Sequence, residues 1–263
     1  MIIIAGTHRS GSSYVAGLLH DCGLPLGPSA DFLPADPANP LGYFEQRAVV
    51  DLNSRIITGF RRMQSPLEGL VCRAVYATRP GPEAIARRAA RRVDEMRALG
   101  ERFDRTIIKD PRFSLTYPHW TPLARFHGMV VVMRHPEASA RSMHRRDRIP
   151  RGVAYRFWDY HVEGLLRWLP AERTLFVDFD RLAGPDSDEE LRRLHVYFAP
   201  AVPEAEFVRR GRAMFADELR HWAPRSEGDL PARTQALWTR VTAMAADHRA
   251  RFSQGERLRP EAW

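Results

Sequence analysis

The chain has few of the features that mark secreted or membrane proteins. Its 263 residues include only Cys22 and Cys72 as cysteines, too few for a disulfide framework, and this favours a reduced, cytoplasmic protein. No apolar run reaches membrane-spanning length, and a strand-like segment begins at the first residues without a basic leader. The histidines show no compact metal-ligand spacing with the cysteines, so no metal site is predicted.

Lysine is nearly absent. The chain has 40 basic residues, and Lys109 is the one lysine among them, so the other 39 are arginines. The net charge of +8 fits an anionic ligand. It is also compatible with a non-catalytic binder of polyanions or nucleic acid, although the chain contains no recognised nucleic-acid module. Against this arginine background, the single lysine becomes a candidate functional residue.

Short apolar, β-branched runs alternate with helical patterns along the chain. Strands are expected at 2–6, 106–110, 128–134 and 174–180, and helices at 12–22, 43–63, 82–100, from Glu137, 152–168, 188–198 and 231–252. This alternation predicts an α/β fold, a P-loop-like parallel sheet flanked by helices in a single domain. The motifs lie in a core over 1–198, and 199–263 reads as a C-terminal helical segment.

The first strand runs into a glycine- and serine-rich turn. Its sequence fits the phosphate-loop pattern G-x-x-x-x-G-K-[ST] at Gly6, Gly11 and Ser13, but Ser12 stands where the lysine belongs. Backbone amides from Arg9 to Ser13 can point at an anion above a helix N-terminus. The loop therefore predicts an anion site that lacks the group which handles a terminal phosphate.

Two further strand ends carry candidate site residues. In parallel sheets, ligands bind beyond the carboxyl ends of the strands, where the second strand ends at Lys109 and the third at Arg134. Arg134 stands where the corresponding strand of a P-loop kinase would carry a metal-binding aspartate. A kinase of a nucleotide or small molecule is thus an alternative that this residue and the missing loop lysine disfavour. The same two features predict a site that works without Mg²⁺.

Two segments together resemble a known enzyme family. THRSGSS (7–13) matches the 5′-phosphosulfate loop of sulfotransferases that use 3′-phosphoadenosine-5′-phosphosulfate (PAPS), and VVVMRHPEASARS (130–142) matches their 3′-phosphate motif. FVDFDRL (176–182) resembles the segment that follows, so the resemblance covers roughly residues 1–198. It implies sulfuryl transfer to a hydroxyl of a small molecule, glycan or lipid, with release of 3′,5′-ADP. The regions of the chain that would contact the acceptor match no known segment.

The resemblance also implies which residues bind the donor. Arg9 would reach the bridging and sulfonate oxygens, where charge develops as the sulfate ester breaks. Arg134 and Ser142 would hold the 3′-phosphate. His8 departs from the family pattern, where a proline is common. The full donor-binding set is His8, Arg9, Ser10, Gly11, Ser12, Ser13, Arg134 and Ser142.

Catalytic roles for Glu45 and Lys109 follow from the same resemblance. Glu45 follows a proline-rich loop (25–42) and is expected to open a helix, where the tyrosylprotein and glycan branches of the family place a base. IIKDPRF (107–113) resembles a segment of the tyrosylprotein branch whose lysine stabilises the transition state, so Lys109 takes that role. Pro111 occupies the position of the histidine base of the cytosolic small-molecule branch, which disfavours such a base. Asp110 and His8 are the next candidates for the base.

One further basic segment lies outside the matched region. The segment Arg209–Arg210–Gly211 is a candidate contact to the 3′-phosphate, because the family often has a basic residue and a glycine at this late place in the sequence. The sequence predicts no oligomeric state.

Overall fold

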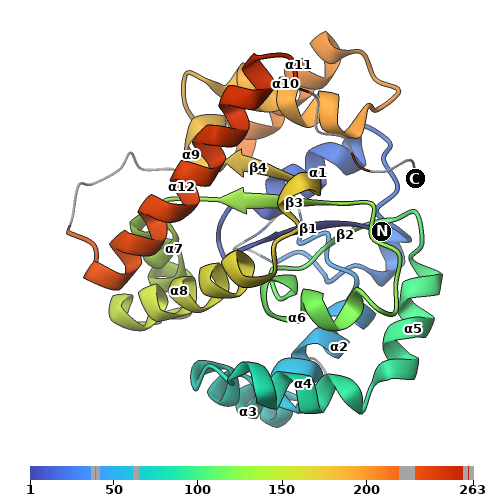
Figure 1. The fold of residues 1–263 in the computed structure, drawn as a ribbon, viewed down its shortest axis with the longest axis vertical. Helices are drawn as coiled ribbons and strands as arrows, with labels where there is room; N and C mark the ends of the chain where they lie inside the picture. Colours follow the sequence, from blue (N-terminus) through green and yellow to red (C-terminus); the bar gives the residue numbers. More distant parts are fainter. Residues whose placement is uncertain (37–38, 40–41, 62–64, 219–228, 257–259, 261–263) are drawn as a thin grey trace.

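Four parallel strands form the centre of the molecule (Figure 1). The computed structural model describes residues 1–263 except 37–38, 40–41, 62–64, 219–228, 257–259 and 261–263. The strands are β1 (Ile2–Gly6), β2 (Ile107–Lys109), β3 (Gly128–Met133) and β4 (Thr174–Asp178), in the order β2-β1-β3-β4. The predicted α/β fold with a helix-flanked parallel sheet is confirmed.

Both faces of the sheet are covered, which explains why its strands are continuous runs of isoleucine and valine. Alternate residues enter different layers: Ile3 and Val131 face one core, while Ile4 and Val130 face the other. The first core is completed by α2 (Arg47–Thr58), α4 (Pro82–Ala90), α5 (Val93–Arg102), α6 (Phe113–Trp120), α8 (Arg151–Trp168) and α12 (Ala232–Ser253). The second is completed by α1 (Ser12–Asp21), α9 (Phe179–Leu182), α10 (Ser187–Phe198) and α11 (Glu204–Glu218).

The helix expected over 43–63 is shorter than predicted. It begins at Arg47 and ends at Thr58, because Gly42 and Phe44 both have positive φ angles of 95° and 52° that a helix cannot contain. Gln46 instead pairs with Phe32 in an isolated antiparallel bridge. Glu45 therefore precedes the helix, and the expectation that it opens one was wrong.

Two other helical predictions need correction. The helix expected over 82–100 is divided into α4 and α5, because the backbone turns at Arg92 with φ −132°. Helices α3 (Pro66–Ala77) and α6 were not anticipated. The signal for α3 was present, since the Ser65 side chain caps it by accepting a hydrogen bond from the Glu68 amide. The polar segment 223–231, which the sequence predicts to be a loop because of its proline and glycine, lies mostly outside the described residues.

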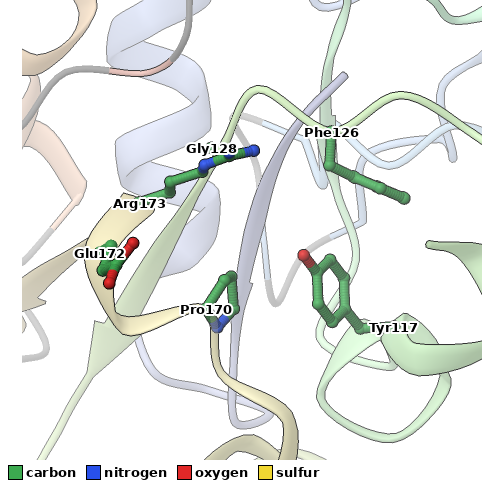
Figure 2. Close-up of a pocket in the computed structure, with 6 residues that line it drawn as sticks. All are labelled: Tyr117, Phe126, Gly128, Pro170, Glu172 and Arg173. Atoms are coloured by element: carbon green, nitrogen blue, oxygen red, sulfur yellow. The ribbon is translucent and has the colours of Figure 1, made fainter.

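The three predicted site segments meet at one edge of the sheet. β1 leads into the phosphate loop and α1, and β2 leads into Asp110. β3, whose arrowhead marks the same edge in Figure 1, leads into α7 (Pro136–Asp147). A pocket of about 390 Å³ lies at the opposite edge of the sheet. Gly128 at the start of β3 and Arg173 just before β4 line it (Figure 2). This pocket is separate from the predicted site.

Candidate functional site

The phosphate loop (residues 6–13) owes its shape to two glycines. Gly6 has φ 146°, and a Cβ there would lie 2.4 Å from the Val132 carbonyl oxygen of the neighbouring strand. Gly11 has φ 92° and its Cβ would lie 2.1 Å from the Phe179 ring. At both positions the positive φ angle favours glycine, and the neighbouring atoms leave no room for a Cβ. The loop is held against β3 and α9.

The loop presents hydrogen-bond donors at the start of α1. Tyr14 and Val15 donate their amides to the Gly11 carbonyl, so the amides of Ser12 and Ser13 have no intrahelical acceptor. Gly11 caps the helix without a side-chain hydrogen bond. The Ser10 hydroxyl is buried and has no hydrogen-bond partner within the described chain. A buried hydroxyl beside free amides is the arrangement expected of an anion cradle.

The two predicted phosphate motifs meet at Arg9. Its Nε donates to the Ser142 hydroxyl over 2.9 Å, although 133 residues separate the two in the sequence. Arg134 Nη1 donates to the Arg9 carbonyl over 3.5 Å, and its Nε has no partner among the described residues. Arg9 itself has φ 65°, an uncommon value for a residue with a side chain. The structure thus brings Arg9, Arg134 and Ser142 together as the sequence predicted.

Burial and neighbouring arginines act on both guanidiniums. Burial and the neighbouring Arg146 lower the pKa of Arg9. Burial also lowers the pKa of Arg134, against the attraction of Asp180. The Arg134 guanidinium lies 5.2 Å from the centroid of the Phe179 ring, close enough for a cation–π contact. Charges that repel one another and are poorly hydrated favour the binding of an anion between them.

Lys109 and Glu45 form a buried ion pair beside the loop. Lys109 Nζ lies 2.5 Å from Glu45 Oε1, and the two side chains are 3% and 7% exposed. The same ammonium donates to the Ser13 hydroxyl over 3.2 Å. Ser13 also accepts a hydrogen bond from Asn39 of the proline-rich loop. The structure therefore places Lys109 in contact with the phosphate loop and Glu45 in contact with Lys109.

A second buried pair supports the first. Arg112 Nη1 donates to Asp110 Oδ1 over 2.8 Å and lies 3.7 Å from Glu45 Oε2. Asp110 Oδ2 accepts from the Asn53 amide over 2.9 Å. Both oxygens of Asp110 are thus engaged in a fully buried network. Asp110 is thus held in place through both oxygens, and its role as an alternative base stays a prediction.

His8 contacts a polar chain that the sequence did not predict. Its Nε2 lies 3.4 Å from the Tyr76 hydroxyl of α3, and that hydroxyl lies 2.5 Å from His161 Nε2 of α8. His161 Nδ1 in turn lies 2.5 Å from the Ser114 hydroxyl. Burial, with a contribution from Arg112, lowers the pKa of His161 to about 3, so its imidazole is neutral near pH 7.

The basic segment after the core lies on α11. Arg209 and Arg210 both donate to the Glu206 carboxylate, and Arg210 also reaches the Asp21 carbonyl of α1. The Gly211 carbonyl accepts a hydrogen bond from the buried Tyr14 hydroxyl over 2.7 Å. The structure thus gives each of these residues a partner at α1 or on α11, and their contact with a 3′-phosphate stays a prediction.

The sequence did not predict four residues that lie at or near the site, which are Asn39, Tyr76, Arg112 and His161. Arg112 comes three residues after Lys109 in the segment IIKDPRF, so its closeness to Lys109 in the sequence could have indicated that it lies at the site. Tyr76 and His161 are 85 residues apart, and no local pattern joins them. Within the described ranges, no group of three or more histidine, cysteine, aspartate or glutamate side chains could hold a metal ion. No helix in that part of the chain is long and apolar enough to cross a membrane.

Comparisons with known proteins give two similar solved structures. No family model matches the chain, and no curated protein matches it. A sulfotransferase domain from the Synechococcus PCC 7002 olefin synthase aligns over 92% of this chain and 94% of its own, with 19% identity and a TM-score of 0.49. A sulfotransferase domain from the curacin biosynthetic pathway aligns over 92% and 97%, with 16% identity and a TM-score of 0.48. With TM-scores below 0.5, neither likeness bears on the activity of this chain.

Proposed function

We propose that the chain transfers the sulfuryl group of PAPS to a hydroxyl of a small molecule, glycan or lipid and releases 3′,5′-ADP. The observation that carries this proposal is the contact between Arg9 and Ser142. It joins a phosphate loop without its lysine to the second predicted phosphate motif, which begins on β3 and ends on α7. A donor with anionic groups at both its 5′ and 3′ positions needs two such motifs side by side.

The residues present fit such a donor. Ser10 Oγ and Arg134 Nε are buried polar atoms without a partner in the described ranges, so each can bond a phosphate oxygen at little desolvation cost. The amides of Ser12 and Ser13 would bind the 5′-phosphate. Arg134 and Ser142 would bind the 3′-phosphate, and His8 and Gly11 would complete the loop around the phosphosulfate. The donor supplies a sulfuryl group on a good leaving group.

Lys109 and Glu45 would act on the transfer itself. An ammonium has three donors, and two of those of Lys109 are used by Glu45 and Ser13. The third can stabilise charge on the transferring group, opposite Arg9. Glu45 would take the proton of the acceptor hydroxyl, with Lys109 and Arg112 fixing the orientation of its carboxylate. No metal is assigned a role, because Arg9 and Lys109 would balance the charge.

The proposal is tested by incubating the protein with PAPS and a cell extract and searching for products heavier by one sulfuryl group. We expect a sulfated product and an equal amount of 3′,5′-ADP. Glu45→Gln serves as the matched control, because it keeps the shape of the site and removes the proton acceptor. An absence of 3′,5′-ADP release above that control would contradict the proposal.

A kinase is the second candidate, and one contact favours it. Lys109 Nζ lies 3.2 Å from Ser13 Oγ, so a lysine from the neighbouring strand brings an ammonium to the loop that lacks its own. The two functions differ in donor: a kinase would turn over ATP with Mg²⁺ and would prefer ADP to 3′,5′-ADP. Turnover of ATP at a rate equal to that of PAPS would favour the kinase.

A further inference from the structure

A further arginine on α7 lies close enough to Arg9 to lower its pKa. Arg146 follows Ser142 by four residues on α7, so the two side chains share a face of that helix. Ser142 accepts the hydrogen bond from Arg9 on this face. Burial and the charge of Arg146 are the two largest causes that lower the pKa of Arg9. Arg146 therefore belongs to the same positive cluster, although no motif includes it.

Arg146 is held by a residue of the proline-rich loop. Its Nη2 donates to Asp36 Oδ2 over 3.3 Å, and the two side chains are 22% and 39% exposed. Its guanidinium lies 5.2 Å from the centroid of the Tyr43 ring. The Tyr43 hydroxyl donates to the same Asp36 oxygen over 2.6 Å. Arg146 Nε also lies 3.4 Å from Asp147 Oδ1, the next residue on α7. Asp36 is thus the carboxylate that reaches Arg146 from outside its own helix.

Tyr43 links this group to the catalytic pair. Lys109 Nζ lies 5.9 Å from the centroid of the Tyr43 ring. The same ring also contacts the Arg146 guanidinium. Burial, together with the hydrogen bond to Asp36, raises the pKa of Tyr43 to about 12, so the phenol stays protonated and keeps donating to Asp36. The loop that carries Glu45 is therefore fastened to α7 at the same point where Arg146 meets Asp36.

We propose that Arg146 is a further anion-binding residue of the donor site, and that Asp36 competes with the anion for it. The ligand class is a phosphate or sulfate group of the donor. This rests on the proposed function for the identity of the donor, but the competition itself concerns any multiply charged anion at the loop. Asp36, which is 39% exposed and lies 3.3 Å from Arg146, is a weak partner. A phosphate group with two charges is a stronger one.

The competition is tested by calorimetric binding of inorganic pyrophosphate and of 3′,5′-ADP. Arg146→Gln should weaken both by about 10-fold or more, the scale for losing a hydrogen bond from a charged group. Asp36→Asn should strengthen both by about 2- to 5-fold, because the competing charge is gone and the shape is kept. In the double variant, Asp36→Asn should have no effect beyond that of Arg146→Gln, since the two act on one another.

A matched pair controls for the change in overall charge. Arg97 and Asp94 form a 2.9 Å salt bridge on α5 and are both exposed. Arg97→Gln and Asp94→Asn change the net charge by the same amounts and should leave both affinities unchanged. Circular dichroism checks that each variant remains folded.

The outcomes separate this inference from the proposed function. Pyrophosphate binding that follows the expected pattern supports the inference, whatever happens with 3′,5′-ADP. Failure to bind 3′,5′-ADP in the parent protein would count against the proposed function alone. The inference is overturned if pyrophosphate does not bind, or if Asp36→Asn leaves its affinity unchanged or lower.

Discussion

Removing the charge of Glu45 should lower both the stability of the protein and its turnover. Four charged groups lie in one buried cluster: Glu45 and Asp110 are the anions, and Lys109 and Arg112 are the cations. Glu45→Gln leaves two cations facing one anion. A buried hydrogen bond to a charged group is worth ~1.5–3 kcal/mol, so we expect the free energy of unfolding to fall by that amount. Turnover should fall by ~10²–10⁴, the usual cost of losing a general base.

A double variant tests the reasoning. Glu45→Gln with Lys109→Met leaves one anion and one cation, Asp110 and Arg112, which remain paired at 2.8 Å. Replacing a buried ion pair by neutral groups is often close to neutral for stability. We therefore expect the double variant to regain most of the unfolding free energy while its turnover stays at the level of Glu45→Gln or below.

The assays are urea denaturation and release of 3′,5′-ADP from PAPS with the extract that gives the highest rate in the parent protein. Gln46→Glu is not a useful control, because Gln46 donates to the Leu26 carbonyl and is itself buried. The exposed variant Glu95→Gln, which loses a salt bridge to Arg55 at the surface, serves instead and should change neither quantity by much. Near-parental turnover in folded Glu45→Gln would refute the assignment of the base.

Four other perturbations follow from the site. Lys109→Arg should keep most PAPS affinity but lose more than ~10-fold in kcat, because a wider guanidinium cannot replace an ammonium between Glu45 and Ser13; equal rates would make the single lysine incidental. Arg134→Ala should weaken 3′,5′-ADP by ~10-fold or more and ADP far less, as measured by calorimetry. Chelation with EDTA should leave turnover nearly unchanged, whereas a loss restored by Mg²⁺ would favour the kinase. In the unfolded chain His161 takes up a proton near its usual pKa of 6.5, whereas in the folded state its pKa is about 3, so acidification from pH 7.5 to 5 should lower the free energy of unfolding by ~2 kcal/mol through this group. Burial likewise lowers the pKa of His248 to about 4. His161→Gln should therefore reduce the dependence of stability on pH, measured by urea denaturation, without abolishing it.

The strands and the phosphate loop were predictable because their signals are local. Ile2–Gly6 and Gly128–Met133 are continuous apolar runs, and buried parallel strands are built from such runs. The loop carries its glycines at the positions that its backbone requires. The start of α2 was not predictable, because a positive φ at Phe44 and a bridge to Phe32 depend on tertiary contacts.

The candidate site was predictable as far as the strand ends reach. Arg9, Lys109 and Arg134 all lie at the carboxyl edge of a parallel sheet, so the topology alone brings them together. The side chains that surround those residues were not predictable in this way. Asp36 meets Arg146 across 110 residues, and Tyr76 meets His161 across 85. Such pairs depend on how helices pack, which one sequence does not specify.

The sheet order has a consequence for how the chain folds during its synthesis. β1 lies inside the sheet, between β2 and β3, and its first residue pairs with Ile107 and Gly128. At ~5–20 residues per second, a ribosome needs roughly 6 to 25 seconds to produce the partners of this strand. Until then the run IIIA is an unpaired apolar segment, of the kind that chaperones recognise and that aggregates when left exposed. The residue order that places the phosphate loop at the centre of the sheet therefore also makes its strand wait for partners that lie more than 100 residues further along the chain.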